Sequence, residues 1–312
     1  MKFELNHDWQ GNMSSPRSTL GDKTKIHLFL ILAIIWIFTG LVGNSPWIPA
    51  ESENVSMVMD IVSNNSILAP LAASQDSINN PPLYPFIGAT FVKIFSSILA
   101  PHDAIRLSNF VWISLTLVSI GLMTRELWGP GFGRQAGLIF IASIGLIFNV
   151  HSIRPEVAAL LGFALALYGF SLYHRRPFRA SLVLGFGISI IFLSNGILSL
   201  LSIFLTALSM LFIKQWRNKR YYLFCFISSL IALIIISPWI YLLYNSNPKI
   251  FFSWLNNVNA PNGEEFFFYI KNMLWFTWPA LPLFIFVLIK NFWSIFQLKK
   301  IHLPLFFSIS IL

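Results

Sequence analysis

The sequence predicts an all-α, polytopic membrane helix bundle with an interfacial helical first exoplasmic loop. Of its 312 residues, 56% are apolar and 11% are charged, against about 25% charged in a soluble domain. Apolar runs recur from Ile26 nearly to the last residue, and a run of ~18 residues crosses ~30 Å of hydrocarbon as a helix. The basic residues behind the net charge of +9 form short clusters between these runs, which is typical of topology signals. We therefore expect membrane lipids as partners, and no nucleic acid.

The first elements are a polar cytoplasmic tail over residues 1–25 and a retained helix over Ile26–Gly43. That apolar run is longer than the ~7–15 residues of a signal peptide, and no A-x-A-like cleavage site follows it. Residues 26–312 form the transmembrane domain. The single cysteine, Cys225, lies in an apolar stretch, which excludes an intramolecular disulfide and a cysteine-cluster metal site.

About nine spans follow from the apolar runs. They are Ile26–Gly43, Leu107–Thr124, Ala136–Val150, Val157–Tyr173, Ala180–Leu193, Gly196–Ile213, Tyr221–Tyr244, Met273–Ile289 and one starting near Ile301. The ninth run is truncated at Leu312 and is too short to cross, so the sequence is expected to be an N-terminal fragment of a longer protein.

The segment Leu83–Ala100 is apolar enough to cross, yet it contains Lys93 and follows two prolines. If it stays outside, 12 basic residues in the later connections face the cytoplasm and four face outward; if it crosses, the ratio reverses. Cytoplasmic connections carry the excess of Lys and Arg in membrane proteins. We therefore predict a cytoplasmic N-terminus, an exoplasmic loop over residues 44–106, and an interfacial position for this segment.

Glu51 and Glu53 follow the first span, and apolar residues at helical spacing come after them. This pattern predicts a short amphipathic helix on the membrane, which would hold both carboxylates at the water boundary, where a base meets a lipid head group. Alternatively, both acids are simply solvated.

Arg154, Pro155 and Glu156 open the fourth span. Proline and glutamate are ordinary first-turn residues, because they suit the unpaired amides and the positive end of the helix dipole. Capping therefore explains Glu156. It explains Arg154 less well, since charged groups at the membrane edge are costly unless they are paired or functional.

Two further candidates lie in the same loop. The run Asn79–Tyr84 precedes the interfacial segment, and Arg106 stands where the chain returns to the membrane. The planar donors of arginine suit phosphate oxygens, although a membrane-edge arginine more often extends its charge to the water.

Over nearly the whole chain, the order of these features resembles the GT-C class of membrane glycosyltransferases, especially bacterial relatives of the enzyme that attaches aminoarabinose to lipid A. Those proteins have Pro-Asp-Glu after the first span, Lys-Pro-Pro-Leu-Tyr later in the loop, Ala-Arg-Leu at the second span and an acid opening the fourth. The matching residues here are Pro49-Ala50-Glu51, Asn80-Pro81-Pro82-Leu83-Tyr84, Ile105-Arg106-Leu107 and Glu156. Later matches are Leu193-Ser194-Asn195-Gly196, Ser237-Pro238-Trp239 and Trp278-Pro279.

The resemblance implies a glycosyltransferase of the cell inner membrane that acts in the cell envelope, including lipopolysaccharide modification. It would move a sugar from a polyprenyl-phosphate donor to a lipid or glycan acceptor outside. The implied catalytic residues are Glu51, by preference, Glu53 and Glu156. The implied substrate-binding residues are Arg106, Arg154, Asn80 and Tyr84. Some family members use a divalent metal cation, for which Glu156 is the implied ligand.

Three departures from the family pattern leave two outcomes open: Glu51 or Glu53 takes over as the base, or the chemistry is lost. Ala50 replaces the family's presumed catalytic aspartate, and Asn80 and Asn195 replace two lysines. An inactive member of the same fold is therefore one alternative to the enzyme. A transporter or flippase is another, although its polar residues would be expected near the membrane midplane.

Overall fold

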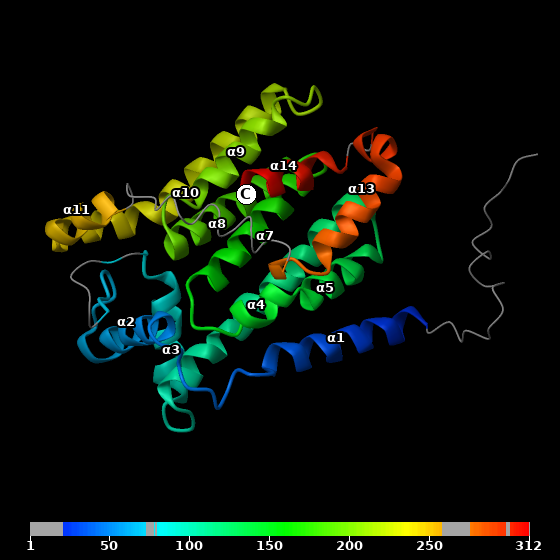
Figure 1. Ribbon diagram of the computed structural model, residues 1–312. Helices are drawn as coiled ribbons and strands as arrows, with labels where there is room; N and C mark the ends of the chain where they lie inside the picture. Colours follow the sequence, from blue (N-terminus) through cyan, green and yellow to red (C-terminus); the bar gives the residue numbers. More distant parts are fainter. Residues whose placement is uncertain (1–20, 73–77, 79, 258–274, 298–299, 312) are drawn as a thin grey trace, which may run out of the picture.

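The computed structural model describes residues 21–72, 78, 80–257, 275–297 and 300–311. Within these ranges the chain folds into helices and contains no strand, which agrees with the predicted all-α class (Figure 1). The helices are α1 (Asp22–Phe38), α2 (Ala50–Asn64), α3 (Leu83–Phe95), α4 (Pro101–Trp128), α5 (Phe132–Ala142), α6 (Ile144–Asn149), α7 (Glu156–Leu172), α8 (Pro177–Asn195), α9 (Leu200–Met210), α10 (Lys219–Ser246), α11 (Pro248–Asn257), α13 (Ala280–Gln297) and α14 (His302–Ile311).

Among the residues that the structure describes, three helices, α4, α8 and α10, are long and apolar enough to cross a membrane by length and composition. They contain the predicted second, fifth and seventh spans, and α1 and α7 overlap the first and fourth. Proline at the first turns of α4 and α8 suits the unpaired amides there, and glycines with positive φ, Gly129 and Gly196, follow their last turns. The start of the eighth predicted span, residues 273–274, lies outside the described residues.

The third predicted span is divided. Ser143 has extended backbone angles and separates α5 from α6, and the Ile144 amide donates to the Trp278 carbonyl at 2.9 Å. Non-helical backbone at membrane depth is tolerated where protein surrounds it, and Ser143 is buried. The sixth predicted span is also shorter than expected, because Gly196 ends α8 and α9 begins only at Leu200.

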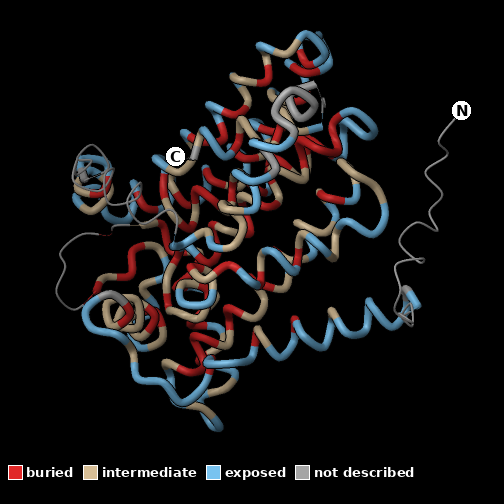
Figure 2. The backbone as a smooth tube through the Cα atoms, turned by 45° about the vertical axis from the view of Figure 1, so that its right-hand side comes forward, coloured by how far each residue is buried: buried red, intermediate tan, exposed pale blue. Residues whose placement is uncertain are grey.

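Helix α7 lies at the centre of the bundle and packs against α4 and α8, while α8 packs against α10. Helix α10 buries residues at helical spacing, from Tyr221 to Leu243, on one side only. Its other side exposes large apolar side chains such as Phe226 and Leu233. Figure 2 shows α1 as an outlying helix that is exposed along most of its length. Such apolar exposure suits lipid rather than water.

The loop helices α2 and α3 lie at one end of the bundle, the same end as α11 (Figure 1). Helix α3 has 13 residues, so it is only about 20 Å long, which is too short to cross the hydrocarbon. It packs instead against α2 and α4, in agreement with the predicted interfacial position. The Trp239 indole of α10 donates to the Leu68 carbonyl at 3.0 Å and ties the loop to the bundle.

Candidate active site

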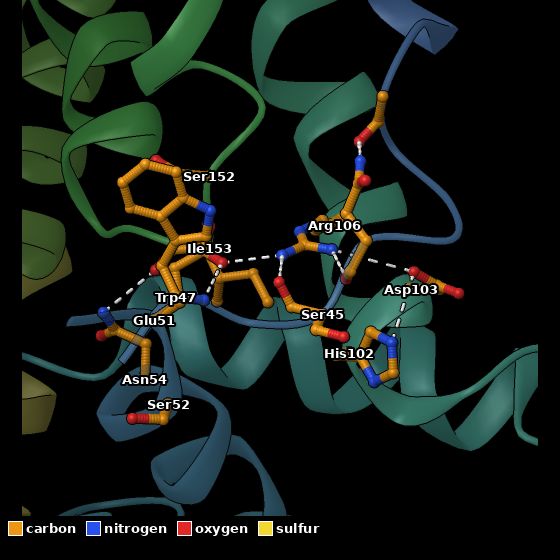
Figure 3. A network of polar contacts seen from close by, with 12 residues as sticks. Ser45, Trp47, Glu51, Ser52, Asn54, His102, Asp103, Arg106, Ser152 and Ile153 are labelled. Atoms are coloured by element: carbon orange, nitrogen blue, oxygen red, sulfur yellow. Dashed lines mark hydrogen bonds and ion pairs between the residues drawn. The ribbon is translucent and has the colours of Figure 1, made fainter. Parts of the chain in front are cut away.

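Glu51 lies in the first turn of α2, where it joins three segments of the chain (Figure 3). Its Oε2 accepts hydrogen bonds from the Trp47 amide at 2.9 Å and from Arg106 Nη2 at 2.7 Å. Its Oε1 accepts from the Ile153 amide at 2.8 Å. The residue is 3% exposed. Both carboxylate oxygens are therefore committed to contacts inside the protein.

Arg106 projects from α4 into the same cluster and is 2% exposed. Besides Glu51, it donates to the carbonyls of Asn44 and Ser45, and it lies 3.9 Å from Asp103. Asp103 in turn accepts from the Gly43 amide at 3.1 Å. Arg106 thus holds the chain between α1 and α2 against the start of α4. It does not line the nearby cavity that contains Glu53 and Arg154.

The hydrogen bonds around Glu51 determine its charge. Burial alone would raise the pKa of this carboxyl, because it penalises the charged form. The amides of Trp47 and Ile153 and the guanidinium of Arg106 outweigh burial, so the pKa of Glu51 lies below its ordinary value of 4.5. Glu51 is therefore held as a carboxylate, which makes it a buried ion-pair partner for Arg106.

A cavity of about 200 Å³ lies beside this cluster. It is enclosed by one face of α2, by the chain leading into α3 and by the start of α7. Its lining residues are Glu53, Asn54, Met57, Asn80, Pro81, Pro85, Arg154, Pro155 and Glu156. Polar groups separated by up to 103 positions in the sequence thus surround one space, which is the usual form of a ligand site.

The charged groups of the cavity are two carboxylates and one guanidinium. Glu53 and Arg154 are half-buried, and Glu156 is exposed at the first turn of α7. The Arg154 Nε atom is buried and has no hydrogen-bond partner among the described residues. A buried donor without a partner carries a desolvation cost, which an anionic ligand in the cavity would remove.

The structure divides the predicted site residues into two groups. Glu53, Asn80, Arg154 and Glu156 come together around the cavity. The other three, Glu51, Arg106 and Tyr84, are buried behind it and do not line it. The carboxylate of Glu51 is occupied by Arg106 and two amides, whereas Glu53 lines the cavity.

Tyr84 is fully buried and donates its hydroxyl to Asn109 Oδ1 at 2.9 Å. Sequence reasoning missed Asn109, because an amide within an apolar span looks like an isolated polar residue. It also missed Asn54, which lines the cavity and donates to the Ile153 carbonyl at 3.0 Å. The only available signal was the position of Asn54 beside Glu53 on a short helix.

Within the described residues, no three His, Cys, Asp or Glu side chains gather in a way that could hold a metal ion. A magnesium ion at a phosphate ligand commonly uses only one or two protein carboxylates. Glu53 and Glu156 therefore fit such an ion only with oxygens supplied by the ligand.

The helix bundle, with its interfacial loop helices and a cavity at that end, has the GT-C fold expected from the sequence. Its fold matches the crystal structure of ArnT from Cupriavidus metallidurans in the apo state, with a TM-score of 0.77 at 14% identity, over 92% of this chain and 53% of that one. The structure of ArnT bound to undecaprenyl phosphate matches with a TM-score of 0.76 at 14% identity, over 93% and 59%. The chain thus spans little more than half the length of these proteins.

Residues 79–242, more than half of the chain, match the family described as dolichyl-phosphate-mannose-protein mannosyltransferase. The protein belongs to this family. No curated protein matches the sequence. The predicted resemblance to GT-C glycosyltransferases is confirmed by the family and by the fold together.

Proposed function

We propose that the protein is a glycosyltransferase that moves a hexosyl or pentosyl group from a polyprenyl-phosphate donor to a hydroxyl of a lipid or glycan acceptor. The reaction would take place at the exoplasmic face of the cell inner membrane. The observation that carries the proposal is the cavity itself, in which Glu53, Arg154 and Glu156 meet. The family assignment and the fold shared with a protein that binds undecaprenyl phosphate support the same class of donor.

The size and position of the cavity suit the head group of such a donor. At about 200 Å³ it is smaller than the ~300–1,000 Å³ of sites that bury a whole drug-sized ligand. It would therefore receive the sugar and the phosphate, while the polyprenyl chain stays in the membrane beside the loop helices. With α3 at its predicted interfacial position, the cavity would open at the depth where lipid head groups lie.

Glu53 is the proposed general base of a single displacement. The acceptor oxygen forms a bond to the anomeric carbon as the bond from that carbon to the phosphate oxygen breaks. Glu53 takes the hydroxyl proton, and the polyprenyl phosphate leaves with the bonding electron pair. General base catalysis of this kind contributes about 10²–10⁴-fold to a rate.

Arg154 would stabilise the negative charge that grows on the leaving phosphate, because its Nε is already buried at the cavity without a partner. A donor aimed where charge develops acts most strongly in the transition state. Glu156 would be the protein ligand of a divalent cation at the donor phosphate, where the cation would offset negative charge.

Transfer in membranes from a labelled polyprenyl-phosphate hexose or pentose tests the proposal. We expect Glu53→Gln to lower kcat at least about 100-fold, and Arg154→Gln to lower it similarly, with protein levels unchanged. Glu126→Gln is the matched control, because that carboxylate contacts Arg175 far from the cavity.

Full activity of both the Glu53→Gln and Glu156→Gln variants would contradict the carboxylate mechanism. If the wild-type protein binds undecaprenyl phosphate but transfers no sugar from any donor, it is an inactive member of the family and the proposal fails. Ala50 and Asn80, which depart from the family pattern, make this second comparison necessary.

A further inference from the structure

A chain of buried hydrogen bonds lies directly behind the cavity wall. The Tyr84 hydroxyl donates to Asn109 Oδ1 at 2.9 Å. Asn109 Nδ2 then donates to the carbonyls of Val150 and Ser152, at 3.0 and 2.9 Å. Tyr84 of α3 is thus linked through Asn109 of α4 to two backbone carbonyls of the connection between α6 and α7.

Tyr84 and Asn109 are both 0% exposed, so water cannot replace either partner. Burial raises the pKa of Tyr84, which keeps its phenol protonated and able to donate. Asn109 uses its amide oxygen on Tyr84 and its amide hydrogens on the two carbonyls, so its orientation is determined by its partners. A fully satisfied buried network of this kind specifies one arrangement of the backbone.

Two side chains of α2 also contact the connection between α6 and α7. Glu51 accepts from the Ile153 amide, and Asn54 donates to the Ile153 carbonyl. Residues 150–155 have no helical structure of their own beyond a turn, so these side-chain contacts, together with the flanking helices, determine their path. Arg154 follows Ile153 directly, so its position depends on the path of these residues.

We propose that Tyr84 and Asn109 are positioning residues, which hold the backbone of residues 150–154 so that the Arg154 guanidinium faces the cavity. This inference rests on the proposed function, in which Arg154 stabilises the leaving phosphate. Neither side chain touches the cavity, so their effect on sugar transfer passes through Arg154. A displacement of about 1 Å at a reacting group can cost about 100-fold in rate.

Tyr84→Phe tests the proposal, because it removes one oxygen and keeps the ring in the core. We expect kcat for sugar transfer to fall about 10- to 100-fold, with the KM for the donor changed less than threefold. Tyr241→Phe is the matched control, since it removes an exposed hydroxyl on α10. Asn109→Asp should give the same kinetic pattern, because it sets a carboxylate against two carbonyls.

A double-mutant cycle separates positioning from a general loss of structure. In the Arg154→Gln background, adding Tyr84→Phe should change kcat less than threefold, because the residue through which Tyr84 acts is gone. If the double variant instead lowers kcat by the product of the two single effects, the proposal is overturned. Unchanged kcat in Tyr84→Phe, with an active wild type, would overturn it as well.

Hydrogen exchange at the amides of Ile153 and Arg154 gives a readout that does not depend on activity. Tyr84→Phe should accelerate exchange at these amides and leave α8 unchanged; equal exchange in both proteins would overturn the inference. If the wild type transfers no sugar, the proposed function fails, and the exchange result still decides whether Tyr84 holds this backbone.

Discussion

Two glutamates only two positions apart have different environments at the start of α2. Successive residues of a helix are turned by about 100°, so Glu51 and Glu53 point to nearly opposite sides. Glu51 meets Arg106 and the amide of Ile153, while Glu53 lines the cavity. The sequence pattern favoured Glu51 as the base, which stays a prediction. In the structure Glu51 is a buried ion-pair partner of Arg106.

The buried pair should contribute far more to stability than an exposed one. Arg106→Gln leaves the Glu51 carboxylate without its counter-charge at 3% exposure, and breaking such a pair costs about 3–5 kcal/mol. Glu126→Gln, which removes the partner of the 65% exposed Arg175 side chain, should cost less than about 1 kcal/mol. Unfolding in detergent micelles measures both changes in the free energy of unfolding. Equal costs would contradict the assignment of Glu51 and Arg106 as a buried ion pair.

The lowered pKa of Glu51 also predicts how stability depends on pH. Above the ordinary value of 4.5 the carboxylate is charged in both states and its stabilisation is complete. As the pH falls below 4.5 the unfolded state binds a proton first, so stability is lost progressively until the pH is below the folded pKa. Between pH 6 and 3.5, the melting temperature of the wild type should therefore fall more steeply than that of Glu51→Gln. If the melting temperatures of the two proteins fall in parallel, another titratable group dominates the pH dependence.

At the scale of elements, glycines allow α7 and α8 to pack with their backbones in contact. A Cβ atom at Gly162 would lie 2.8 Å from the Gly187 carbonyl oxygen, and one at Gly187 would lie 2.8 Å from the Gly162 carbonyl oxygen. Small residues at helix crossings are the usual basis of tight association in membranes. The crossing matters for function, because α7 begins with Glu156 of the cavity.

Gly187→Ala should therefore destabilise the bundle. Overpacking of a close contact typically costs about 1–3 kcal/mol, because the backbones of both helices must separate. Gly121→Ala in α4 is the control, since a Cβ atom there would meet nothing within 4 Å, and alanine is the better helix former. Melting temperatures in detergent compare the two variants; a loss in Gly121→Ala as large as in Gly187→Ala would argue against the close crossing.

At the scale of the whole molecule, the loop helices and the basic turns occupy different parts of the bundle. The loop helices α2 and α3 and helix α11 lie at one end of the bundle (Figure 1), and the cavity lies there between α2, the start of α3 and the start of α7. Exposed basic residues of the α7–α8 and α9–α10 turns, such as Arg176 and Arg217, belong to the connections that the charge pattern assigns to the cytoplasm.

This arrangement predicts which positions react from outside the cell. In a Cys225→Ser background, a cysteine at exposed Ser63 of α2 should react with an impermeant maleimide in intact cells. A cysteine at exposed Gln215, in the α9–α10 turn, should react only after permeabilisation. The reverse pattern would place the N-terminus outside and move the cavity to the cytoplasmic face.

The sequence by itself determined the class, the helical segments and the order of the motifs. Hydropathy and charge are local properties that add up along the chain, so Ile26–Gly43 and Tyr221–Tyr244 could be recognised without knowledge of their neighbours. The break at Ser143 could not, because the amide that follows it bonds to the carbonyl of Trp278, more than a hundred positions away.

Only the tertiary structure decided which motif residues meet. Glu53, Asn80 and Arg154 share one cavity because α2, the start of α3 and the start of α7 converge there. Asn109 donates to the carbonyls of Val150 and Ser152, which lie 41 and 43 positions later in the chain. A local sequence pattern shows that a polar residue is present. Its partners depend on how distant segments of the chain pack. That packing determines whether a charged side chain is paired, buried or open to a ligand.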